Sequence, residues 1–163
     1  MLDDPFKYGL LAALAIALLV AAFTDLRQRR IGNWLTGAIA LAAPMFWWAD
    51  GLSLWPEVAF QIGLALAAFA VLAALFAMNA MGGGDVKLLA ALALWVRPEA
   101  FIFLIMVMAL LGGALTVLFG IRHIMRRQRD KLAVPYGIAI AMAGLWTLGV
   151  EYLPATAATG AVG

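Results

Sequence analysis

Long apolar runs recur along the whole chain, interrupted by short breaks that contain charged residues, glycine or proline. Most of these runs are long enough, as helices, to span the roughly 30 Å of hydrocarbon in a bilayer. Since 66% of the residues are hydrophobic and 12% are charged, one water-soluble core could not bury all of this apolar surface. We therefore expect an all-α integral membrane protein. The expected bundle of about six transmembrane helices comprises residues 8–23, 34–48, 58–78, 84–96, 100–119 and 135–153.

The breaks between the runs contain neither a linker nor a soluble domain. We expect residues 1–154 to form a single transmembrane domain and residues 155–163, which are mostly small, to form a disordered tail. The first span should stay in the protein rather than act as a signal peptide, because two aspartates outnumber the one lysine before it. The chain has no cysteine and a single histidine, His123, so we expect no metal site and no other cofactor.

Basic residues are concentrated in three of the breaks. Of the 11 lysines and arginines, all but Lys7 and Arg97 follow the first, third or fifth span. The positive-inside rule places these three breaks in the cytoplasm and both termini outside it, which predicts a multi-pass protein of the bacterial inner membrane. Tryptophans and tyrosines near the span ends, among them Trp47, Trp95 and Tyr152, are expected to anchor the helices at the membrane surfaces.

Three acidic residues fall on the cytoplasmic side, and one of them, Asp130, lies within a basic run. Asp25 ends the first span, which runs inward, and Asp85 opens the fourth, which runs outward. Both carboxylates are therefore expected at a similar depth on one face. Acids near hydrocarbon indicate function by default, although carboxylates that cap helix ends at the interface are also common. The topology by itself leaves both interpretations open.

Three glycines, Gly82, Gly83 and Gly84, stand directly before Asp85. Successive glycines let backbones approach closely and let the chain open locally, which suits a protease that must unwind its substrate beside its acids. A phosphate-binding loop does not fit, because its lysine and hydroxyl spacing is missing and no strand precedes the glycines. A plain helix-packing role for the glycines remains an alternative.

The sequence around the two acids resembles the type IV prepilin peptidases, membrane aspartyl proteases with a glycine-x-glycine-aspartate motif. The segment MGGGDVKLL, residues 81–89, carries this motif with Asp85 as its aspartate. The segment DLRQRRIGN, residues 25–33, is similar to the family's first catalytic region, with Gly32 where the family has proline. The segment VPYG, residues 134–137, matches a third family feature.

This resemblance implies that Asp25 and Asp85 are the catalytic residues of an aspartic endopeptidase, a hydrolase. These 163 residues have neither the room nor the cysteines for the methylating domain of larger members, so the chain is similar to the short, peptidase-only form of tight-adherence (Flp) pili. The implied substrates are Flp-type prepilins and pseudopilins, whose basic leader would be removed after a glycine on the cytoplasmic face. Membrane lipid is the other expected partner, nucleic acid is not expected, and the oligomeric state is left open.

The expected mechanism follows from the two acids. Held close together, two carboxylates cannot both ionise cheaply, so the pair would share one proton near neutral pH. One would act as a base on the attacking water and the other as an acid on the scissile carbonyl. Because such a pair titrates as a unit, the part that each aspartate plays stays open.

Several other residues are expected to support the active site or to bind substrate: Gly82, Gly83, Gly84, Lys87, Asn33, Pro135, Tyr136 and Gly137. Some of them also have ordinary explanations. Lys87 is equally well explained as a lysine that extends to the cytoplasmic surface, and Asn33 as a cap of the second span. Pro135 and Tyr136 also suit the start of the sixth span and the membrane interface.

A small proton-coupled transporter or relay subunit that uses the same two aspartates is the alternative function. A relay predicts acids spread through the membrane depth, whereas the second, third and fifth spans contain no titratable side chain. A purely structural subunit is a further alternative, and it would tolerate loss of either carboxylate.

Overall fold

The structure is a computed structural model that describes residues 5–125 and 136–153. Within these residues it consists of six α-helices and no strand, which confirms the predicted all-α class. The helices are α1 (Pro5–Gln28), α2 (Asn33–Ala49), α3 (Ala59–Ala77), α4 (Gly83–Leu92), α5 (Pro98–Met125) and α6 (Tyr136–Tyr152), with a short kinked segment, η1 (Leu54–Val58), before α3, in which Trp55 has an extended backbone. Pro135 and the tail expected at residues 155–163 lie outside the described residues.

Three helical stretches are long and apolar enough to cross a membrane: Pro5–Gln28, Leu54–Ala77 and Pro98–Arg122. The other helices are shorter, and α4 has only 10 residues. At 1.5 Å per residue α4 rises about 15 Å, which is roughly half the thickness of the hydrocarbon. The fourth predicted span was therefore too long, because helical structure ends at Leu92 and the chain continues as turns.

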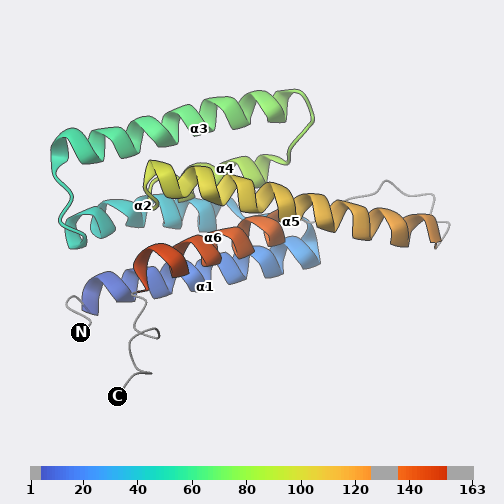
Figure 1. The fold of residues 1–163 in the computed structure, drawn as a ribbon, viewed down its shortest axis with the longest axis horizontal. Helices are drawn as coiled ribbons and strands as arrows, with labels where there is room; N and C mark the ends of the chain where they lie inside the picture. Colours follow the sequence, from blue (N-terminus) through green and yellow to red (C-terminus); the bar gives the residue numbers. More distant parts are fainter. Residues whose placement is uncertain (1–4, 126–135, 154–163) are drawn as a thin grey trace, which may run out of the picture.

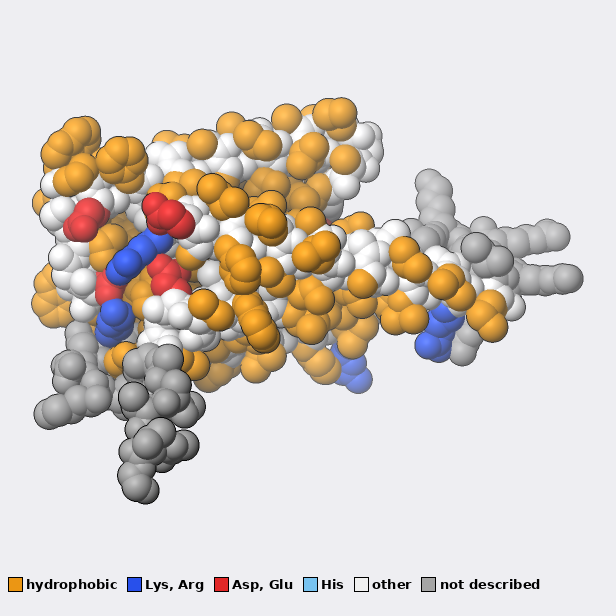
Figure 2. Space-filling model, in the orientation of Figure 1, with side chains coloured by type: hydrophobic (Ala, Val, Ile, Leu, Met, Phe, Trp, Pro, Cys, Tyr) orange, Lys and Arg blue, Asp and Glu red, His pale blue; other side chains and the backbone are white. Residues whose placement is uncertain are grey.

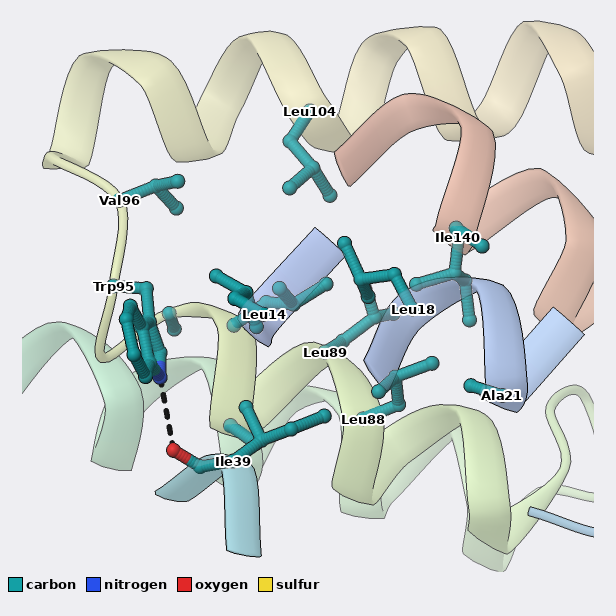
Figure 3. Close-up of a cluster of buried hydrophobic side chains, with 14 of the residues drawn as sticks. Leu14, Leu18, Ala21, Ile39, Leu88, Leu89, Trp95, Val96, Leu104 and Ile140 are labelled. Carbon is teal, nitrogen blue, oxygen red and sulfur yellow. Dashed lines mark hydrogen bonds between the residues drawn. The ribbon is translucent and has the colours of Figure 1, made fainter. Parts of the chain in front are cut away.

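The short helix α4 is surrounded by other helices. It packs against α2, α3 and α6, while α1 packs against α2 and α6, and α5 packs against α6 (Figure 1). Leu88, Leu89 and Leu92 of α4 are fully buried. Apolar side chains of the neighbouring helices, such as Leu18 of α1 and Ile140 of α6, complete this core (Figure 3). The start of α4 is thereby held in a fixed place at one end of the bundle.

Side chains of three other helices satisfy the backbone where α4 ends. The carbonyl oxygens of residues 93 and 96 accept hydrogen bonds from the Gln61 amide of α3. The Trp47 indole of α2 donates to the carbonyl of residue 94 at 2.7 Å, and the Tyr152 hydroxyl of α6 donates to that of residue 95 at 3.0 Å. Non-helical backbone at membrane depth is tolerated only where it is buried in protein and its polar groups are paired. These bonds explain how the helix can stop after 10 residues.

Two aromatic residues do not lie where the sequence suggested. Trp95 is only 2% exposed, stacks on Phe46 with ring centroids 5.0 Å apart, and donates from its indole to the carbonyl of Ile39 at 2.9 Å (Figure 3). Tyr152 is also buried and meets the Phe46 ring edge-on. The prediction that Trp95 and Tyr152 anchor the membrane surface is therefore wrong. The Trp95 indole N–H and the Tyr152 hydroxyl donate hydrogen bonds to backbone carbonyls inside the bundle. Hydropathy alone does not reveal such bonds.

We expect Gln61→Leu to destabilise the protein, because the leucine cannot donate to the carbonyls of residues 93 and 96. A buried carbonyl that loses its partner costs about 1–3 kcal/mol. Gln61 is 5% exposed, so water cannot easily take over these bonds. The measurement is thermal unfolding in detergent, with Gln28→Leu as the matched control at an exposed glutamine. Equal midpoints for the two variants would contradict this account of the end of α4.

Charged side chains mark the end of the bundle where α1 begins and α6 ends (Figure 2). There Lys7 pairs with Asp50, and Arg97 pairs with Glu151 at 3.5 Å. The face between the two ends is covered mainly by apolar side chains (Figure 2). Since α1 runs away from this charged end and α4 runs back towards it, the end of α1 and the start of α4 share the opposite end (Figure 1).

Candidate active site

A cavity of about 600 Å³ lies where α1 ends and α4 begins. Asp25, in the last turns of α1, and Asp85, in the first turn of α4, both line it. The two carboxylates are close enough for their charges to interact. The structure therefore brings together the two acids that the sequence predicted to share one face, although they are far apart in the chain.

Asp25 is the more deeply buried of the two acids. Its side chain is on the packed face of α1, the residue is 7% exposed, and its Oδ2 accepts a hydrogen bond from the backbone N–H of Gly137 at 2.8 Å. Gly137 lies in the first turn of α6, where backbone N–H groups have no partner within the helix. The start of α6 thus fixes the orientation of the Asp25 carboxylate.

Gly137 packs so closely against Asp25 that there is no room for a side chain at position 137. A Cβ atom at Gly137 would lie 2.7 Å from Oδ2 and 2.9 Å from Cβ of Asp25. Real Cβ atoms essentially never approach other atoms this closely, so any larger residue would force the carboxylate to move. Gly137 was one of the predicted support residues, and this contact gives it a physical role.

The three glycines before Asp85 have different neighbours. A Cβ at Gly82, the residue that precedes α4, would lie 2.9 Å from Oδ2 of Asp85. A Cβ at Gly84 would lie 3.2 Å from the side chain of Ile31, in the connection between α1 and α2. Gly83 faces the ring of Phe76. Close approach, one of the two properties expected of these glycines, is therefore present at each position, and all three residues line the cavity.

Asn33 and Lys87 contact each other at the edge of this cavity. The Lys87 ammonium donates to Oδ1 of Asn33 at 2.9 Å, and both side chains are exposed. Gly32, and not Asn33, is the residue that precedes α2, and no side chain caps that helix. The prediction that Asn33 caps the second span is therefore wrong, since its amide pairs with Lys87 instead.

Tyr136 lies away from the two acids. Its hydroxyl is 2.9 Å from the hydroxyl of Thr116 on α5, and its ring packs so closely on Gly112 that a Cβ there would lie 2.7 Å away. It is not among the described residues that line the carboxylate cavity. Tyr136 thus joins the start of α6, where Gly137 lies, to α5.

Arg29 lines the cavity, although the sequence indicated it only as a topology signal and as part of the segment 25–33. It follows α1 with a φ of 52°, a left-handed conformation that residues other than glycine rarely adopt. Its guanidinium is close enough to Asp25 for their charges to interact. The sequence signal for this backbone conformation is the position of Arg29, because left-handed residues usually occur just beyond the end of a helix.

The chain was compared with known protein families. Residues 12–117 match the type IV leader peptidase family, a stretch that includes both aspartates and the three glycines. No curated protein and no solved structure gives a significant match to the chain. Because the family match extends over more than half of the 163 residues, the chain belongs to the type IV leader peptidase family and is an aspartic-type prepilin peptidase, a hydrolase.

Proposed function

We propose that Asp25 and Asp85 are the catalytic pair and that they remove the basic leader of Flp-type prepilins and pseudopilins at the cytoplasmic face of the bacterial inner membrane. The observation that carries this proposal is the shared cavity of about 600 Å³, which two carboxylates from different helices both line. A volume of this size accommodates a water molecule together with an extended stretch of substrate backbone.

In the proposed reaction no covalent intermediate forms. One carboxylate removes a proton from water as the water oxygen attacks the scissile carbonyl carbon. The other donates a hydrogen bond to the carbonyl oxygen, and a proton then passes to the departing amine as the carbon–nitrogen bond breaks. The pair is restored when the products leave. We assign the chemistry to the pair and not to either aspartate alone.

The proposed topology has six membrane-embedded helices with both termini outside the cytoplasm. It is supported by the positions of Arg27, Arg29 and Lys87, which lie at the same end of the bundle as the two acids. By the positive-inside rule that end faces the cytoplasm. In this arrangement α4 reaches only part of the way across, and the paired turns after it lie inside the protein.

A proton relay with the same two aspartates has less support. Neither α2 nor α3 contains a charged residue, and α5 has none between Glu99 and Arg122. The acids of the described helices gather at the two ends of the bundle, which suits a surface-facing hydrolytic site better than a path across the membrane.

The test is co-expression with a Flp-type prepilin, followed by mass spectrometry of the product. We expect one cut that follows a glycine at the end of the basic leader, and no such product when Asp85→Asn replaces the natural chain. Cleavage elsewhere in the substrate, or the same product from Asp85→Asn, would overturn the proposal. A prepilin of another pilus type, tested in the same assay, separates Flp specificity from peptidase activity. If the two prepilins were processed equally well, the Flp assignment would be wrong and the peptidase activity would stand.

A further inference from the structure

A second, largely apolar hollow of about 410 Å³ lies between α2 and α3, with α4 beside both. The lining comes from three stretches: 33–40 of α2, 62–69 of α3, and 87–94 of α4 and the turn that follows it. Each stretch corresponds to about two helical turns, or roughly 10 Å. We call this hollow the α2–α3 groove. Its lining includes small residues on α2 and α4 and larger apolar ones on α3: Gly37, Ala40, Ala90, Ala91, Leu66 and Phe69.

One end of the α2–α3 groove is polar and adjoins the carboxylate cavity. Asn33 lines both the groove and the cavity, so the two hollows share a wall. Lys87 also lines the groove at this end, donates to Asn33 at 2.9 Å, and comes two residues after Asp85. The α2–α3 groove thus ends in two polar side chains, at the wall that it shares with the cavity of the proposed catalytic pair.

We propose that the α2–α3 groove binds the apolar helix of the prepilin that adjoins the cleavage site. This inference rests on the proposed function and adds where the substrate is held. A leader that is removed at the end of a membrane-embedded bundle is cut next to the bilayer, and a substrate segment that continues from there into the bilayer takes the form of an apolar helix. Grooves lined by small residues let a second helix approach closely in a membrane, where van der Waals packing drives association.

The polar end of the groove suits the point where the substrate helix must open. Peptide-bond cleavage needs an extended backbone, so carbonyl groups of the substrate lose their helical partners just before the cavity. Lys87 carries three N–H donors, of which one is used on Asn33, and the Asn33 amide carries two more. These donors lie where the unpaired carbonyls would be. A lipid chain, the competing occupant, needs neither the donors nor a position beside the cavity.

Gly37 offers a direct test, because it lines the groove and nothing lies within 4 Å of a Cβ placed there. The Cβ of a leucine at this position would meet open space, the rest of its side chain would occupy the groove, and leucine would favour the helix over glycine. We expect Gly37→Leu to raise KM for the full-length prepilin about tenfold while kcat changes by less than about twofold, as loss of uniform binding requires. The matched control is Gly113→Leu on α5, which is equally open and outside the groove.

A crosslinking measurement identifies the occupant. The chain has no cysteine, so Gly37→Cys and Gly113→Cys each introduce the only thiol. With a cysteine in the apolar segment of the prepilin and Asp25→Asn to prevent turnover, a disulfide should form with Gly37→Cys and not with Gly113→Cys. A lipid-filled groove predicts no crosslink and an unchanged KM for Gly37→Leu, and that result would overturn the inference.

The assay separates failure of this inference from failure of the proposed function. If Gly37→Leu has the KM of the natural chain and Asp85→Asn is inactive, the groove does not bind substrate and the catalytic pair stands. If Asp85→Asn processes the prepilin normally, the proposed function falls, and the groove inference falls with it.

Discussion

Prepilin cleavage is expected to fall by a factor of about 10² to 10⁴ in Asp25→Asn and, separately, in Asp85→Asn, the range that a general acid or base contributes. Asparagine has almost the same shape as aspartate but can neither accept nor release the proton that the reaction moves. Its amide oxygen can still accept the hydrogen bond from Gly137, so the local geometry at Asp25 should survive. Leader removal from a Flp-type prepilin, followed over time in detergent, measures the effect.

Glu99→Gln provides the matched control for both substitutions. It makes the same change from acid to amide at an exposed residue on the first turn of α5, at the end of the bundle remote from the cavity. We expect its activity to equal that of the natural chain. Unfolding midpoints within the error of the natural protein for all three variants would exclude a loss of activity through loss of the fold. Substantial activity in either aspartate variant would refute the role of that carboxylate.

Gly137→Ala is expected to lower kcat by about two orders of magnitude, the effect that a misplacement of about 1 Å can have on a catalytic group. The new methyl group would lie 2.7 Å from Oδ2 of Asp25, so the carboxylate must move out of the position that the α6 N–H now fixes. The loss should appear in kcat and not in KM, because the contact orients a catalytic group and does not bind substrate.

Gly149→Ala is the matched control on the same helix. A Cβ at Gly149 meets only Leu153, at an ordinary 3.9 Å, so the substitution should leave activity unchanged and stabilise α6 slightly. If Gly137→Ala retained the kcat of the natural chain, the start of α6 would have no part in positioning Asp25. If Gly137→Ala lost both its fold and its activity, the comparison of unfolding with kcat would assign the effect to the fold. Gly137→Ser could not separate the two effects, because the same contact with Asp25 excludes a serine side chain.

Much of the helix pattern was predictable because apolar length and charged breaks depend on local sequence. Gly51 lies just beyond α2 and Pro98 begins α5, and alternating helix directions placed Asp25 and Asp85 at one end. These inferences need no knowledge of which helix faces touch. The family resemblance then identified the segment before Asp85, and residues 12–117 match that family.

The contacts between helices were not predictable in the same way. In a chain that is apolar on all sides, hydropathy does not distinguish a face that packs on protein from one that meets lipid. The bond from Gly137 to Asp25 depends on the packing of α1 against α6, and the bonds from Gln61 depend on the packing of α3 against α4. Trp95 was misplaced for the same reason, since its position near a span end suited an interface residue equally well.

The central claim is that Asp25 and Asp85 act as one catalytic unit in one cavity, and a double-mutant cycle tests it most directly. Cleavage rates of one prepilin are measured for the natural chain, Asp25→Asn, Asp85→Asn and the double variant. Residues that act as a unit are strongly non-additive, so the double variant should be no slower than the slower single variant. Two independent losses that multiply in the double variant, or a single variant that cleaves at the natural rate, would contradict the account.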